Sequence, residues 1–393
     1  MYRAIHIAKN LKGDRGIWVI VALLCLASIL AVYSSTGTIA FKYNGGHAEI
    51  HLIKHVVIAM VGIFLCYLCY NTHYTVYSKL APILFIISIP LLLYTMVFGP
   101  EINDARRWIS IPGIGLSFQT SDIASIALIM YIARSISMKQ DVIKDFKSAF
   151  LPLMMPIILV CGLIAPNNLS TAMLLFVTSM TLMFIGRVHL KYIFLLVLLG
   201  VGFMGALVLI GMVFPDAVRV ATWTSRFGEF FTDSDGGYQI QQAKIAIADG
   251  GWFGVGPGMS TQRNYLPYSY ADFIYAIIIE EYGLVGGFAI IALFLWLFIK
   301  CTSMVTRSPK TFGALLAMGL CLNIVIQAFA NIAVSVNLVP VTGLTLPLVS
   351  KGGTSMLITC IAFGMILSVS RFIEQSANEV GKVEIQPLDA NHH

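Results

Sequence analysis

Three carboxylates lie in one strongly apolar segment, SYADFIYAIIIEEYGLVGG at residues 269–287. Asp272 comes first, and Glu280 and Glu281 follow it. A positioned carboxylate can take a proton as a general base, whereas a lone charge deep in a membrane helix is costly and needs a partner. Eight residues correspond to about 80° around a helix and nine to about 180°, so at most one glutamate can share the face of Asp272. Asp272 is therefore the candidate base, with a helix cap as the alternative, and the glutamates are candidates for a supporting polar network.

A second group of polar residues occurs in NDARRWISIPGIGLSFQTSD, residues 103–122. Arg106 and Arg107 can bind phosphate in bidentate fashion. Gln119 and Asp122 then enter the next apolar run. This pattern predicts an anion site, and a plain interfacial anchor is the alternative for the arginines.

A third group lies in GLTLPLVSKGGTSM, residues 343–356, directly before an apolar run. Lys351, Gly352, Gly353 and Ser355 combine a cation, free backbone N–H groups and the positive end of a helix, which suits phosphate. A simple cap of the following helix is the alternative. Together the three groups indicate a carboxylate base beside a site for a multiply anionic, lipid-attached substrate.

The composition tells which elements must position these residues. Of 393 residues, 58% are apolar and 11% are charged, and the mean hydropathy is +0.84. A soluble chain carries about 25% charged residues. We therefore predict an all-α integral membrane protein that forms a single membrane domain over 1–393. Segments of about 20 apolar residues predict ten transmembrane helices, at 16–34, 52–71, 80–99, 118–136, 149–165, 169–186, 190–214, 271–299, 312–338 and 353–373.

The basic residues predict the orientation of these helices. Most of the 25 Lys and Arg residues fall on one side, which places both termini in the cytoplasm and 374–393 as a cytoplasmic tail. The connection 215–270 then becomes a large extracytoplasmic loop between helices seven and eight. The remaining basic residues cluster on this outer side, where an anionic ligand would explain them.

Several sequence blocks occur in the order typical of one family. ARRWI at 105–109 precedes FQTSD at 118–122, and GGYQIQQAKIAIADGGWFGVGPG follows at 236–258. The segment beginning YLP at 265 and the segment LVPVTGLTLPLVSKGGTS at 338–355 complete the set. From the first span to the last, the chain resembles the SEDS family (shape, elongation, division and sporulation). The ending after Ser355 resembles its division-type FtsW branch more than its elongation-type RodA branch.

The resemblance implies a peptidoglycan glycosyltransferase that polymerises lipid II at the outer face of the cytoplasmic membrane. Asp272 matches the essential aspartate of the family, the general base of an inverting transfer. The leaving group is undecaprenyl pyrophosphate, whose charge Arg106, Arg107, Arg226, Lys351 or a divalent cation (Mg or Mn) would balance. The metal itself stays open, because no cluster of metal ligands is evident in the sequence.

The resemblance also implies further residues and partners. The expected substrate-binding residues, besides the four cations, are Gln119, Asp122, Gln262, Gly352, Gly353 and Ser355. The expected partners are a class B penicillin-binding protein with transpeptidase activity, other divisome membrane proteins and membrane lipid, but no nucleic acid.

Two departures from the family pattern bear on the site. Ser125 stands where the family places a lysine, and Lys351 stands where tyrosine is common. We hypothesise that Lys351 offsets the missing lysine.

Three alternative functions stay open: a lipid II flippase, in which Glu280 and Glu281 would couple to protons, a non-catalytic divisome scaffold, and an elongation-type polymerase.

Overall fold

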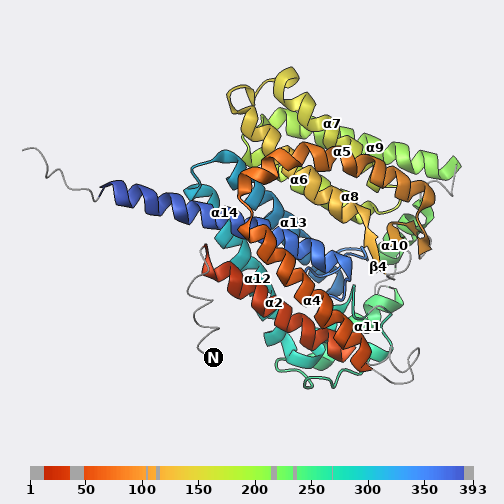
Figure 1. The fold of residues 1–393 in the computed structure, drawn as a ribbon. Helices are drawn as coiled ribbons and strands as arrows, with labels where there is room; N and C mark the ends of the chain where they lie inside the picture. The colour runs from red at the N-terminus through yellow and green to blue at the C-terminus, as the bar shows by residue number, and fades with distance from the viewer. Residues whose placement is uncertain are drawn as a thin grey trace, which may run out of the picture.

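The computed structural model describes residues 13–35, 48–102, 105–111, 116–213, 219–232, 237–267 and 269–384. Over these residues it is a bundle of long helices (Figure 1). Ten helices match the ten predicted spans: α2 (Arg15–Ser35), α4 (Ala48–Asn71), α5 (Tyr74–Phe98), α6 (Thr120–Met138), α7 (Leu151–Ile164), α8 (Leu169–Ile185), α9 (Leu190–Val213), α12 (Ile274–Arg307), α13 (Thr311–Ser335) and α14 (Thr354–Glu384). Among the described residues, nine helical segments are long and apolar enough to cross a membrane, and α8 is a shorter apolar helix. The prediction of a polytopic helical membrane protein is confirmed.

Several predicted boundaries differ from the structure. Helix α5 begins at Tyr74 rather than at residue 80, because Tyr74–Lys79 adds its first turns before the apolar run. Helix α14 continues to Glu384, so the predicted tail 374–393 is helical in its first part, and 385–393 lies outside the described residues. In Figure 1 this extension of α14 projects beyond the rest of the bundle. Its residues are polar, so the helix continues where the apolar span has ended.

The segment between α9 and α12, predicted as a large loop, contains helices of its own. Helix α10 (Val220–Thr232) and helix α11 (Tyr238–Gly250) occupy much of it, followed by the short 3-10 helix η3 (Gln262–Asn264). Residues 214–218, 233–236 and 268 of this region lie outside the described part.

The polar segment before α6 forms two small β-hairpins within the otherwise helical fold. Strand β1 (Glu101–Ile102) pairs with β2 (Ala105–Arg106), and β3 (Trp108–Ile111) pairs with β4 (Leu116–Gln119). Both pairs are antiparallel, and β4 leads directly into α6. The hairpins satisfy backbone polar groups where the chain leaves the helices.

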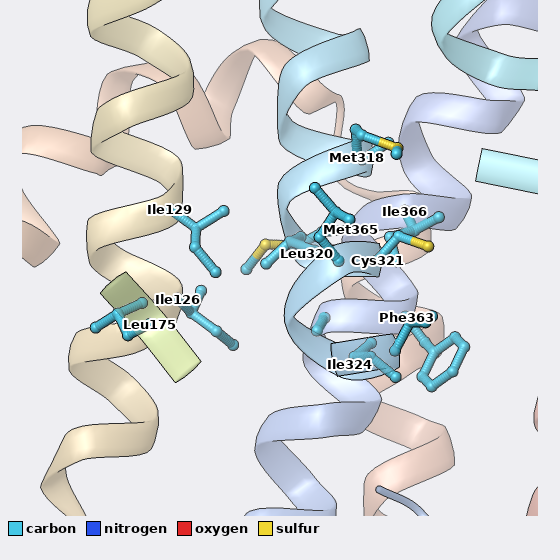
Figure 2. Close-up of a cluster of buried hydrophobic side chains, with 14 of the residues drawn as sticks. Ile126, Ile129, Leu175, Met318, Leu320, Cys321, Ile324, Phe363, Met365 and Ile366 are labelled. Carbon is cyan, nitrogen blue, oxygen red and sulfur yellow. The ribbon is translucent and has the colours of Figure 1, made fainter. Parts of the chain in front are cut away.

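Helix α13 is the centre of the bundle. It contacts α5, α6, α8, α11, α12 and α14, and its side chains are apolar and buried on nearly every face, as expected for a central helix. Figure 2 shows one layer of this core, in which Ile129 of α6, Leu175 of α8, Cys321 of α13 and Phe363 of α14 pack together. By contrast, α9 packs against α8, α10 and the segment around Phe150 and exposes most of its apolar residues, as a lipid-facing helix does.

Helix α12 is broken at Gly283, and a glycine-rich segment fills the break. Gly283 has φ 70° and ψ −174°, outside helical geometry. The backbone N–H groups of Val255 and Gly256 donate to the carbonyls of Glu280 and Glu281, at 2.9 and 3.1 Å. In return, the N–H of Leu284 donates to the carbonyl of Gly251 at 2.9 Å. The break is tolerated because another stretch of backbone takes up its polar groups.

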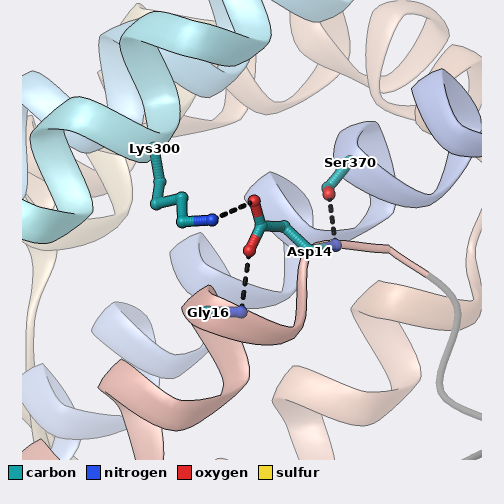
Figure 3. A network of polar contacts seen from close by, with 4 residues as sticks. All are labelled: Asp14, Gly16, Lys300 and Ser370. Atoms are coloured by element: carbon teal, nitrogen blue, oxygen red, sulfur yellow. Dashed lines mark hydrogen bonds and ion pairs between the residues drawn. The ribbon is translucent and has the colours of Figure 1, made fainter.

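At one end of the bundle, an ion pair joins α2, α12 and α14 (Figure 3). Asp14 accepts a hydrogen bond from the N–H of Gly16 at 2.7 Å, which caps α2. Its carboxylate pairs with the Lys300 ammonium at 3.0 Å, and its own N–H donates to Ser370 Oγ at 2.7 Å. We call this the Asp14 end of the bundle, and the opposite end the Asp272 end.

Candidate active site

A cavity of about 570 Å³ opens at the Asp272 end. It is enclosed by the hairpin of β3 and β4, the first turns of α6, α8 and α14, the middle of α13, and the segments around the start of α10 and before α12. Eight of the residues predicted for the site line it: Arg107, Gln119, Asp122, Arg226, Asp272, Lys351, Gly352 and Ser355. Residues from distant parts of the chain therefore converge on one site.

Asp272 lies two residues before α12, whose N-cap is Phe273, so it does not itself cap the helix. Its backbone is fixed from two sides. Asn331 of α13 donates its Nδ2 to the Asp272 carbonyl at 2.7 Å, and Ser350 Oγ donates to the preceding carbonyl of Ala271 at 2.6 Å. Gly343, with φ 72°, lies beside the Asp272 side chain, and a Cβ there would be at ordinary contact distance, 3.9 Å, from Asp272 Oδ2. The backbone that carries the carboxyl group is thus fixed at the cavity wall.

Burial and charge oppose each other at this carboxyl group. Burial raises the pKa of Asp272 above its ordinary value, while the nearby positive charges of Arg226 and Arg107 act to lower that pKa. Neither arginine forms a close ion pair with it: over the described residues, the ion pairs within 4.0 Å are Arg106–Glu101 and Lys300–Asp14. The arginines leave space between themselves and the carboxylate.

The arginines of the cavity crowd one another. Burial, followed by the charges of Arg219 and Arg226, lowers the pKa of Arg107 to about 10. Burial and the Arg219 charge also lower the pKa of Arg226. Arg107 Nε donates to the carbonyl of Asn167 at 2.6 Å, and an Arg226 guanidinium nitrogen donates to the carbonyl of Val341 at 3.1 Å. These bonds fix cations whose mutual repulsion an anion in the cavity would relieve.

Lys351 adds a fourth cation from the turn before α14. Its N–H donates to the Tyr270 carbonyl at 2.9 Å, and its Nζ lies 5.2 Å from the centre of the Tyr270 ring. Burial, then the charge of Lys54, lowers the pKa of Lys351. Gly353, with φ 51°, lets the chain turn into α14 but is not part of the cavity wall.

The part of the cavity lined by the end of β4 and the first turns of α6 is polar. Gln119 ends β4 and donates its Nε2 to Ser121 Oγ at 2.7 Å. Asp122 and Ser125 follow in the first turns of α6, and Ser125 Oγ donates to the Ser121 carbonyl at 2.7 Å. Ser125 and Lys351 line the same cavity, so a lysine at either position would bring its charge to the same space.

Five of the residues predicted from the sequence lie away from the cavity: Gly353, Arg106, Gln262, Glu280 and Glu281. Arg106 pairs with Glu101 at 3.7 Å, with 47% of its side chain exposed. The carboxylate of Glu280, 1% exposed, accepts bonds from the N–H groups of Thr261 and Gln262, at 2.7 and 3.1 Å. Glu281 accepts a hydrogen bond from Ser34 Oγ of α2. The two glutamates therefore tie α12 to the segment before it and to α2.

The structure adds cavity residues that we did not select from the sequence. Arg219 is the most important, because it faces Arg107 and Arg226. The only feature of the sequence that pointed to Arg219 was its place among the basic residues of the 215–270 segment. Four amide side chains also line the cavity: Asn168, Gln239, Asn323 and Gln327. Amides within apolar helices were the signal that could have identified Asn323 and Gln327.

The fold and the cavity define a multi-pass membrane protein with a buried carboxylate facing a cationic wall. The sequence profile of the FtsW, RodA and SpoVE family, described as cell cycle proteins, matches residues 14–375. This chain belongs to that family.

Individual relatives are similar in sequence to this chain over nearly its full length. The chain is 31% identical to the probable peptidoglycan glycosyltransferase FtsW of Geobacter sp. (strain M18), over 89% of this chain and 94% of that protein. It is 33% identical to the protein of the same name from Halomonas elongata, over 90% of this chain and 89% of that protein. Stage V sporulation protein E of Bacillus subtilis is 30% identical, over 93% and 98%.

Two solved structures have a similar fold. A chain of a peptidoglycan synthase complex that coordinates polymerization and crosslinking aligns with a TM-score of 0.71 and 24% identity, covering 92% of this chain and 98% of that chain. The rod shape determining protein RodA of Thermus thermophilus aligns with a TM-score of 0.66 and 22% identity, covering 92% and 98%.

Proposed function

We propose that this chain is a peptidoglycan glycosyltransferase that polymerises lipid II into glycan strands during cell division. The observation that carries the proposal is one cavity in which Asp272 faces Arg107 and Arg226. Relatives named as probable peptidoglycan glycosyltransferases FtsW support it. Because those relatives are FtsW proteins, the division role is preferred to the elongation role.

The proposal gives a role to each group of cavity residues. Asp272 accepts the proton of the acceptor sugar hydroxyl while that oxygen attacks the anomeric carbon of the donor. The bond from that carbon to the pyrophosphate oxygen breaks, and the configuration inverts because attack and departure occur on opposite faces. Arg107, Arg226 and Lys351, with Arg219 beside them, stabilise the charge that develops on the departing undecaprenyl pyrophosphate.

A divalent cation is compatible with the donors present. Asp122 Oδ2 and Asn323 Oδ1 are buried oxygens without a hydrogen-bond partner in the described structure, and both residues line the cavity. Oxygen donors of this kind suit Mg²⁺ or Mn²⁺. Asp122 and Asn323 would hold the ion, which would add positive charge beside the pyrophosphate when bound. Over the described residues no group of three or more His, Cys, Asp or Glu side chains converges, so the substrate would supply further ligands.

We extend the proposal to location and partners. The Asp272 end would face outward from the cytoplasmic membrane, where lipid II is presented, with both termini in the cytoplasm. A class B penicillin-binding protein would crosslink the product, alongside other divisome membrane proteins. The similar fold of a chain from a synthase complex that joins polymerization to crosslinking supports such a partner.

The test is glycan polymer formation by the purified protein with lipid II and its cognate transpeptidase. Wild type should produce polymer, and a folded Asp272→Asn variant should produce none. Equal polymer from both would overturn the assignment of the base. Lipid II translocation without polymer would instead identify a flippase, for which the described structure offers little, because Glu280 and Glu281 lie outside the cavity.

A further inference from the structure

A buried polar pair lies between α2 and α4, outside the cavity. Ser28 of α2 is 0% exposed and His55 of α4 is 2% exposed. Polar side chains inside a membrane bundle are costly and are found where they are paired and have a role. The mechanism described above uses neither residue.

The direction of the hydrogen bonds follows from the number of protons. Ser28 Oγ donates to the carbonyl of Val349 at 2.9 Å, and it lies 2.8 Å from His55 Nε2. A hydroxyl has a single proton to donate. Since that proton goes to Val349, His55 Nε2 must carry a proton and donate it to Ser28 Oγ. The bonds therefore run from His55 through Ser28 to the Val349 carbonyl.

Val349 belongs to the turn formed by residues 346–351. Leu348, directly before it, has φ 61°, a backbone region that costs free energy for a residue with a side chain. Such a conformation persists only where its surroundings hold it in place. The bond from Ser28 holds the carbonyl that follows this strained residue.

The same turn carries the groups that reach the active site. Ser350 Oγ donates to the Ala271 carbonyl at 2.6 Å, beside Asp272. The N–H of Lys351 donates to the Tyr270 carbonyl, and its side chain lines the cavity. Lys351 is also near enough to the His55 ring to interact with it electrostatically. The turn therefore links the buried pair to both the base and the fourth cation.

We propose that His55 and Ser28 are positioning residues for glycosyl transfer. They hold the turn 346–351, and through it Lys351 and the backbone before Asp272, without touching the substrate. The proposal rests on the proposed glycosyltransferase function.

The first test compares two serines of α2 in the full-length protein. Ser28→Ala should lower kcat for lipid II polymerisation about tenfold, because small displacements of reacting groups slow the reaction strongly. Ser35→Ala is the matched control: Ser35 is also 0% exposed, but its Oγ donates to the Ala31 carbonyl of its own helix. Ser35→Ala should leave kcat unchanged, and equal effects of the two variants would overturn the proposal.

Conservative variants separate positioning from packing. His55→Gln keeps an N–H donor for Ser28 and should retain most activity, whereas His55→Leu removes the donor and should match Ser28→Ala. Equal activity of the two His55 variants would contradict the proposal.

A second measurement does not depend on activity. Hydrogen–deuterium exchange of residues 344–353 should become faster in Ser28→Ala and His55→Leu, and stay unchanged in Ser35→Ala. If the wild type forms no polymer, the proposed function fails, but this comparison still tests whether the pair holds the turn. Unchanged exchange in all three variants would overturn the proposal.

Discussion

The two ends of the helix bundle differ in whether their charged side chains are paired. At the Asp14 end, the carboxylate of Asp14 meets the Lys300 ammonium at 3.0 Å and also caps α2. At the Asp272 end, the carboxylate and the described arginines make no ion pair with one another within 4.0 Å, and burial together with the charge of Arg219 lowers the pKa of Arg107 and of Arg226. Charges that satisfy each other stabilise the fold. Charges held apart across a cavity are available to a substrate, and we expect the two ends to respond differently to the same kind of substitution.

The largest contrast should come from removing one charge at each end. Asp272→Asn should lower polymerisation by about 100-fold or more, since it removes the general base. Its thermal stability should not fall, because burial of the carboxylate already raises its pKa, which means that folding favours the neutral form. Asp14→Asn should keep its activity. Polymer assays and thermal unfolding of both variants check this, and a large loss of stability in Asp272→Asn would break the comparison.

Two adjacent arginines provide a contrast within the Asp272 end. Arg107→Gln should lower kcat by about 100-fold, as loss of a group that stabilises transition-state charge does. Arg106→Gln should change it little, because Arg106 is exposed and pairs with Glu101. Steady-state kinetics with lipid II would measure both variants. Similar losses would mean that the cavity does not bind the pyrophosphate as proposed.

A lysine at position 125 should compensate for the loss of the Lys351 charge, because both positions line the cavity. Lys351→Tyr should lower polymerisation about tenfold, the effect of losing one charged hydrogen bond. Adding Ser125→Lys should restore much of this activity, because both residues line the same cavity. Lys351→Tyr with normal turnover would end the idea that Lys351 offsets the lysine missing at Ser125.

The pH dependence of the rate should show the effect of Arg226 on the pKa of Asp272. A general base works deprotonated, so the rate falls as the pH decreases through the pKa of Asp272. Arg226 acts to lower that pKa, so Arg226→Gln should raise it and shift the acid limb of the pH–rate profile to higher pH. Arg106→Gln is the control and should leave the acid limb in place, and an unshifted limb in Arg226→Gln would argue against Asp272 as the titrating group.

The smallest effect should come from the ion pair at the Asp14 end. Lys300→Met should lower the free energy of unfolding by about 1 kcal/mol or less, since partly exposed ion pairs contribute little. The loss should shrink at high salt, where exposed charges are screened. Denaturation in detergent at low and high salt would measure the loss. An effect of several kcal/mol would show that the ion pair contributes much more to stability than a partly exposed contact does.

The helices and the position of Asp272 in the cavity could be predicted because each depends on local sequence. Long apolar runs define the spans, and a carboxylate at the start of such a run marks Asp272. The choice between Arg106 and Arg107 could not be predicted, because successive side chains of an extended segment point to opposite sides. Which side faces the cavity is set by the register of the hairpins, in which Glu101 pairs with Arg106 and Trp108 with Gln119.

Longer-range contacts account for the other differences. Gln262 belongs to the segment before Asp272, but its N–H binds Glu280, a contact that brings two parts of the chain together only in the folded state. Arg219 lies directly before α10 and lines the cavity with Arg226 of that helix. Neither contact leaves a periodic signal in the sequence.

The break in α12 at Gly283 and the glycine-rich stretch around Gly254 depend on each other for their conformation. A Cβ on Gly254 would lie 2.2 Å from the Glu281 carbonyl oxygen, and one on Gly283 would lie 2.2 Å from the Trp252 carbonyl oxygen. Main chain there touches main chain, and no side chain can adjust to absorb an intrusion. Deleting the glycine-rich stretch would leave peptide groups of α12 unpaired within the bundle, at several kcal/mol each. Neither stretch can be exchanged for the sequence of another protein without the other. Both must therefore be kept together in any chimaera built from this protein.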